Sequence, residues 1–198
     1  MNGRQHSRRA RSQCGATLIE ILVSLVILMV GILGLIGVMI QSQRAQLESY
    51  QRVQALLLVQ DMAARITANR AAADCYVQAG AIGTGQDSAA LDATACAVGD
   101  ATQKGRTTRD LQDWNDLLKG SAETTTSGGV TTEVGAMLGA RGCVAKDAAT
   151  GVFQVSVVWQ GAESGGAPPA GITCGNGLYG ASDANRRAVS VAVLPAST

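Results

Sequence analysis

One carboxylate lies inside a long apolar segment near the start of the chain. Glu20 is followed by 20 uncharged, mostly apolar residues at positions 21–40. Insertion scales penalise an acidic residue at the centre of a membrane helix by roughly 2.5–3.5 kcal/mol, and by less towards the interface. Because an isolated charge is costly there, a lone carboxylate in such a run indicates a function. Glu20 is therefore the first candidate for a functional residue.

Cysteines are the second group of residues with defined chemistry. The chain has five, and a cut after Gly15 would remove Cys14 and leave an even number. The remaining four form no CxxC pair, and their spacing does not match a zinc site. We expect two disulfides in an oxidising compartment, formed by Cys75, Cys96, Cys143 and Cys174. The preferred pairing is Cys75 with Cys96 and Cys143 with Cys174, and the other two pairings remain open.

The residues needed for catalysis are missing or isolated. The single histidine, His6, lies before Gly15, so the rest of the chain has no imidazole for a nucleophile or metal site. Asp110, Asp113 and Asp116 recur every three residues, which indicates a solvated helix face. No glycine motif matches a phosphate or dinucleotide site. The sequence predicts no enzyme, no catalytic residue, no cofactor and no metal.

Charge also separates the start of the chain from the remainder. Four arginines precede Gly15, at positions 4, 8, 9 and 11. The rest of the chain therefore has 12 basic and 15 acidic residues. This balance argues against nucleic acid as a partner. By the positive-inside rule, the arginines place the N-terminus in the cytoplasm and everything after position 40 outside the inner membrane.

Residues 16–40 are predicted to span the membrane as a helix. The apolar run at 21–40 is about 30 Å long in helical form, close to the hydrocarbon thickness of a bilayer. A secretory signal peptide would have a shorter apolar region and a small-residue cleavage site, and positions 39–43 offer none.

The helix is expected to continue to about residue 73, because positions 41–73 contain neither proline nor glycine. Its apolar side chains form a stripe that needs a covering surface. The predicted members of that stripe are Leu47, Tyr50, Val53, Leu57, Leu58, Met62 and Ile66.

Residues 74–198 are expected to form a globular head in the periplasm. We expect a loop region at 79–108, a short helix at 109–119 that stops at Gly120, and a flexible link at 121–135. Alternating patterns predict strands at 152–160 and 187–194, and a further short strand is expected at 142–146. Trp114 and the strand valines are predicted core residues, and a glycine- and proline-rich excursion at 161–185 needs tethering.

The segment at 15–23, GATLIEILV, resembles the class III signal of type IV prepilins and of type II secretion pseudopilins. The resemblance implies that 1–15 is a leader peptide, that prepilin peptidase cuts between Gly15 and Ala16, and that Ala16 becomes the N-methylated terminus. It further implies that Glu20 is the carboxylate that guides assembly. The chain departs from the family pattern at Ala16, because most members carry phenylalanine there.

Looser patterns at 31–35 and 57–63, Asp113-Trp114 and the strand at 155–160 resemble the minor pilins called PilV, or type IV pilus modification proteins. This resemblance implies an α+β pilin fold, in which a long N-terminal helix packs on an antiparallel sheet. It implies a structural subunit that initiates or modulates pilus assembly, and so acts in adhesion or twitching motility. The implied partners are prepilin peptidase, the major pilin, other minor pilins, a pilus-tip adhesin and the inner membrane.

Two alternative functions remain open from the sequence. The first is a minor pseudopilin of a type II secretion system, which would carry the same signal and helix. The second is an unprocessed single-pass membrane protein with a periplasmic binding head.

Overall fold

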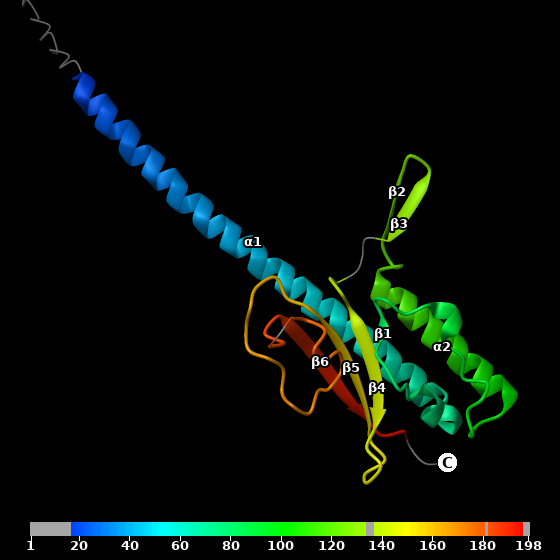
Figure 1. Cartoon of the computed structure of the whole chain (residues 1–198). Coiled ribbons are helices and arrows are strands. Elements are labelled where there is room, and N and C mark those ends of the chain that lie inside the picture. Colours follow the sequence, from blue (N-terminus) through cyan, green and yellow to red (C-terminus); the bar gives the residue numbers. More distant parts are fainter. Residues whose placement is uncertain (1–16, 134–136, 181, 196–198) are drawn as a thin grey trace, which may run out of the picture. The chain divides into compact units, whose positions relative to one another are not determined.

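The computed structural model describes residues 17–133, 137–180 and 182–195. Its longest element is helix α1, Leu18–Ala68, with 51 residues. The chain divides into two compact units, Met1–Ala45 and Gln46–Thr198. The second unit contains the end of α1 and all the other helices and strands (Figure 1). A long apolar N-terminal helix and an antiparallel sheet confirm the predicted α+β pilin-like fold class.

Within the second unit, one face of α1 packs into the hydrophobic core. Its buried residues are Ala55, Val59, Met62 and Ile66, which recur every three or four positions, as expected for one side of a helix. They share a core cluster with the sheet residues Val155 and Val157. The predicted burial of Met62 and Ile66 is therefore confirmed.

The prediction is wrong for four other members of the stripe. Their side chains are 52–60 % exposed, at Leu47, Tyr50, Val53 and Leu57. At about 100° per residue, Val53 and Leu57 lie on nearly the opposite side of the helix from Ala55. The prediction relied on large apolar side chains. It therefore missed the first two residues of the buried face, Ala55 and Val59, whose side chains are smaller.

The α-helix ends at Ala68, and the 3₁₀ helix η1, Arg70–Tyr76, follows it. The expected end near residue 73 is therefore too late. Asn69 is buried, and its Nδ2 donates to the Gln103 carbonyl and to Thr107 Oγ1, both at 3.0 Å. Both partners lie in the helix at Ala101–Lys119, so the turn at Asn69 depends on contacts with a distant segment and could not be predicted from neighbouring residues.

Helix α2 spans Ala101–Lys119, so the short helix predicted at 109–119 is eight residues too short. Asp100 and Gln103 form a capping box at its start: Asp100 Oδ1 accepts from the Gln103 N–H at 2.8 Å, and Gln103 Oε1 accepts from the Asp100 N–H at 2.9 Å. Gly120 ends the helix in the left-handed conformation, as predicted.

Four antiparallel strands form the main sheet in the order β1-β4-β5-β6. The last three, β4 (Arg141–Lys146), β5 (Phe153–Gln160) and β6 (Arg186–Val193), confirm the predicted strands to within one residue. The short β1 (Ile82–Gly83) and the 3₁₀ helix η2 (Ser88–Ala90) lie in the segment predicted as a loop.

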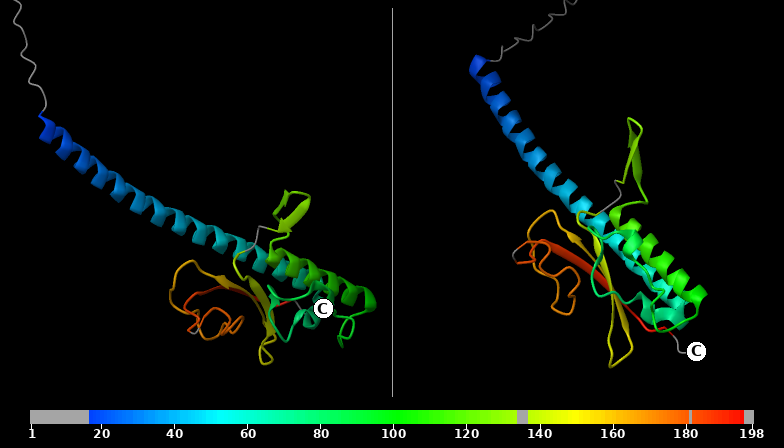
Figure 2. Two further views of the ribbon diagram at one scale, coloured as in Figure 1. Left: turned by 45° about the horizontal axis from the view of Figure 1, so that its top comes forward. Right: turned by 45° about the vertical axis from the view of Figure 1, so that its right-hand side comes forward.

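The sheet and α2 enclose the core together with the end of α1 (Figure 2). Trp114 is completely buried, as predicted, and its Nε1 donates to the Leu58 carbonyl at 2.9 Å. Its indole ring lies directly over Gly142 of β4. This glycine lets the helix approach the sheet closely.

A two-stranded hairpin replaces the flexible link predicted at 121–135. Strands β2 (Thr124–Ser127) and β3 (Val130–Glu133) pair antiparallel. Gly128 and Gly129 form the turn with φ of +60° and +81°, the signs that a two-residue hairpin turn requires. Polar threonines obscured the strand pattern in the sequence.

Candidate functional site

Glu20 lies in the first turn of α1 and is exposed. Its backbone N–H donates to the Thr17 carbonyl at 3.0 Å, and its own carbonyl accepts from the Ser24 hydroxyl at 2.7 Å. Both contacts use the backbone of Glu20, so the carboxylate is not needed to form this turn. The predicted cleavage residues Gly15 and Ala16 lie outside the described residues.

An exposed apolar surface surrounds Glu20. The leucine, isoleucine, valine and methionine side chains at 18–40 are 46–82 % exposed. By length and composition, α1 is the one helix in the described part of the chain that could cross a membrane. Since water is a poor solvent for such a surface, lipid or other apolar protein must cover it.

Two disulfides tie the loops of the second unit to its regular elements. Cys75 of η1 is joined to Cys96 in the loop before α2, and Cys143 of β4 is joined to Cys174. These are the two pairings that the sequence analysis preferred. The second bond anchors the middle of the excursion at 161–185 to the sheet.

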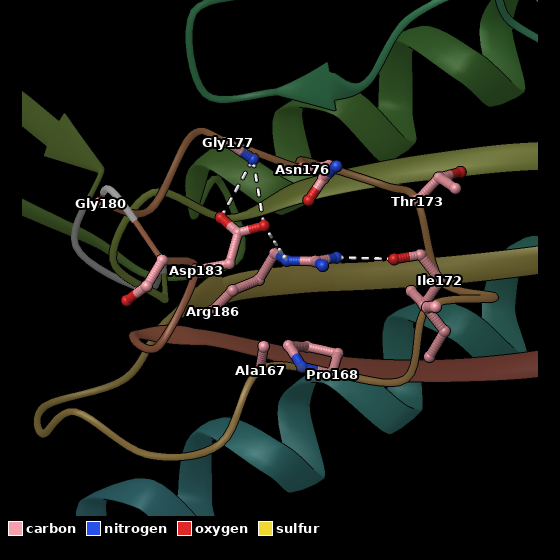
Figure 3. Close-up of a pocket in the computed structure, with 11 residues that line it drawn as sticks. Ala167, Pro168, Ile172, Thr173, Asn176, Gly177, Gly180, Asp183 and Arg186 are labelled. Atoms are coloured by element: carbon pink, nitrogen blue, oxygen red, sulfur yellow. Dashed lines mark hydrogen bonds and ion pairs between the residues drawn. The ribbon is translucent and has the colours of Figure 1, made fainter.

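A buried ion pair holds the end of that excursion (Figure 3). Arg186 is 4 % exposed, and its Nη1 donates to the carbonyls of Ile172 and Cys174 at 2.7 and 2.9 Å. Its Nε lies 3.2 Å from Asp183 Oδ2. The Asp183 carboxylate also accepts from the Gly177 N–H at 3.0 and 3.1 Å. The buried guanidinium thus joins two carbonyls and one carboxylate of the loop, and so holds the loop in one conformation.

Asp183 and Arg186 were not predicted from the sequence. An acidic and a basic residue three positions apart, just before a predicted strand, were the pattern in the sequence that could have indicated an ion pair. Only the folded loop brings the carbonyls of Ile172 and Cys174 to the same guanidinium.

The acidic face of α2 is only partly the solvated face that the sequence predicted: the side chains of Asp113 and Asp116 are 65 % and 46 % exposed, whereas Asp110 is not. Asp110 is only 13 % exposed; its Oδ1 lies 3.0 Å from Arg65 Nη1, and its Oδ2 accepts from the Tyr76 hydroxyl at 2.5 Å. Asp113 also pairs with Arg65, and Asp116 accepts from a hydroxyl of η2. The three-residue spacing directs these acids toward partners on α1, η1 and η2, so they stabilise the packing of α2.

Two family models match different parts of the chain. A model described as prokaryotic N-terminal methylation motif matches residues 10–36, and one described as type IV pilin Tt1218 matches residues 38–110. These matches support membership in the type IV pilin family. Neither the search of curated proteins nor the search of solved structures returned a match.

The two matched segments cover almost all of α1. The methylation motif contains Gly15, Ala16 and Glu20, and the pilin model begins inside the apolar run and extends into α2. Pilins are structural, non-enzymatic proteins, so we assign the chain a pilus-related structural role. The apolar helix supports membrane anchoring before assembly.

Proposed function

We propose that this chain is a minor subunit of a type IV pilus, of the group called PilV. Prepilin peptidase removes residues 1–15 and methylates the new terminus at Ala16. The subunit waits in the inner membrane with its N-terminus in the cytoplasm and its second unit in the periplasm, and then joins the filament. The pilin and methylation matches support this proposal at the level of the family.

The observation that carries the proposal is the single charge on an exposed apolar helix. Glu20 is the only charged residue between Ala16 and Gln43, and the apolar side chains around it are exposed. Cleavage creates an ammonium group at Ala16, four residues before the carboxylate. Each charge is costly alone in an apolar surrounding, so pairing between neighbouring subunits favours the correct register.

The second unit then determines how the subunit acts in the assembly. Its disulfides tether loops that can contact other proteins. We propose that it contacts the major pilin, other minor pilins and a pilus-tip adhesin. Through these contacts the subunit initiates or modulates assembly, with consequences for adhesion and twitching motility.

Glu20→Val tests the proposed role of the carboxylate. We expect the variant protein to accumulate in the membrane but to be reduced at least tenfold in sheared pili, because the pairing charge is lost while the apolar helix remains. Immunoblots of membrane and pilus fractions measure both quantities.

Glu20→Asp is the matched control, since it keeps the carboxylate and should be incorporated better than Glu20→Val. Normal incorporation of Glu20→Val would contradict the proposal. Loss of that variant from the membrane fraction as well would show that Glu20 acts in insertion rather than in assembly, and would also contradict it.

A further inference from the structure

Residues of the excursion from Ala167 onward, together with Arg186, line an open cavity of about 580 Å³ in the second unit. This volume lies within the range of small-molecule binding sites. The cavity has polar walls at Thr173, Asn176 and Ser182, and apolar walls at Pro168 and Ile172. It is thus distinct from the apolar helix on which the proposed assembly function depends.

The ion pair of Asp183 and Arg186 forms part of the wall of this cavity. Figure 3 shows the Arg186 side chain extending between Asn176 and Pro168. Its hydrogen bonds to carbonyls leave from Nη1, and its Nε faces Asp183. Arg186 is 96 % buried, and no group among the described residues accepts from its Nη2, while Nε has an ion-pair contact to Asp183 but no hydrogen bond; the guanidinium thus has donors that a ligand in the cavity could use.

The charges of the pair determine which ligands fit. An anion attracted by Arg186 would be repelled by the Asp183 carboxylate, which lies 3.2 Å from Nε. A cation attracted by Asp183 would be repelled by Arg186. A neutral ligand meets neither penalty, and a hydroxyl group both donates and accepts hydrogen bonds. The cavity offers donors at Arg186 and both donors and acceptors at Asn176 and Thr173.

We propose that this cavity binds the terminal pyranose unit of a glycan. Hydroxyl groups on one edge of the ring accept from Arg186 Nη2 and exchange hydrogen bonds with Asn176 and Thr173. The apolar C–H face of the ring packs against Pro168 and Ile172. The disulfide of Cys143 and Cys174 and the bonds from Arg186 keep the loop in the binding conformation, which reduces the entropy lost on binding.

Saturation-transfer NMR on the full chain in lipid nanodiscs tests this proposal. The probes are the methyl pyranosides of glucose, galactose, mannose and N-acetylglucosamine. We expect transfer to the ring protons of at least one glycoside. Asn176→Ala should weaken its binding about five- to tenfold, because one side chain that bonds the ligand is lost. Asn176 is exposed, and its described loop contact, to the Thr173 carbonyl, uses the backbone N–H that alanine also has, so this variant should fold normally.

Gln154→Ala is the matched control, because Gln154 lines a different polar cavity of about 660 Å³ on the sheet that lacks a buried ion pair. Its glycoside affinity should equal that of the unmodified chain. Absence of transfer from all four glycosides would overturn the proposal, and so would equal losses in Asn176→Ala and Gln154→Ala. Displacement of the glycoside by sulfate at comparable affinity would identify an anion site instead.

Discussion

The Tyr76 hydroxyl connects three elements of the second unit. It accepts from Asn69 Nδ2 at 3.3 Å, just after α1, and donates to Asp110 of α2 at 2.5 Å. Tyr76 itself ends η1 and is fully buried. Because buried polar groups are costly when unpaired, this small network favours one arrangement of the two helices over others.

Tyr76→Phe should lower the free energy of unfolding by about 1–3 kcal/mol, since it removes the hydroxyl that donates to the largely buried carboxylate of Asp110. Chemical denaturation of the full chain in detergent, followed by circular dichroism, measures the change. Tyr50→Phe is the matched control: its hydroxyl bonds to Glu123 at the surface, and its loss should cost less than about 0.5 kcal/mol. Equal losses in both variants would contradict the assigned role.

The same network predicts a response to alkaline pH. Burial, together with the hydrogen bond to Asp110, raises the pKa of Tyr76 to about 12, whereas an unfolded tyrosine titrates near pH 10. Between these values the folded state keeps a proton that the unfolded state releases. The stabilisation is thus complete below about pH 10 and is lost as the pH rises to about 12. Tyr76→Phe should reduce this alkaline loss, and an unchanged pH profile would contradict the assignment.

At the scale of elements, two glycines of the second unit have opposite structural roles. Gly142 of β4 lies against the indole of Trp114, and an added Cβ would overlap that ring and approach Leu118 Cδ1 to 2.9 Å. Gly105 lies within α2, where an added Cβ would meet nothing within 4 Å. The first glycine is required by helix–sheet packing, whereas the second only weakens a helix.

The two glycine-to-alanine changes should therefore shift stability in opposite directions. Gly142→Ala should destabilise the chain by about 1–3 kcal/mol through overpacking. Gly105→Ala should stabilise it by about 0.5–1 kcal/mol, because alanine has the higher helix propensity. Thermal or chemical denaturation of the two variants under one set of conditions measures both effects. A stable Gly142→Ala variant would mean that α2 and the sheet are less closely packed than described.

At the scale of the whole molecule, the segment before Ala16 differs from all that follows. It carries four arginines, the single histidine and the unmatched Cys14. A terminus with these charges could not enter the apolar interior of a filament, because each buried charge would be unpaired. The proposed removal of the segment would leave one ammonium group to pair with Glu20.

Intact-mass analysis of the native protein tests this processing. In cells with active prepilin peptidase, the mass should correspond to a chain that begins at Ala16 and carries one added methyl group. A Gly15→Val variant, in which the cleavage site is changed, should keep residues 1–15. Retention of those residues in the unmodified protein would contradict the proposal and favour an unprocessed membrane protein.

Local patterns in the sequence determined where the long helix and the main strands of this protein lie. The apolar run around Glu20 predicts the first part of α1, and alternating residues predict β5 and β6 to within one position. These features depend on neighbouring residues and on the period of one helix or strand, so they can be read without the fold.

Only the tertiary structure decided which polar groups meet. Asp110 was predicted to face solvent but binds Tyr76, which lies 34 positions earlier in the chain. Arg186 binds carbonyls of a loop that periodicity cannot describe. The physical reason is that both contacts join segments distant in sequence, and their partners come within bonding distance only when the chain has folded.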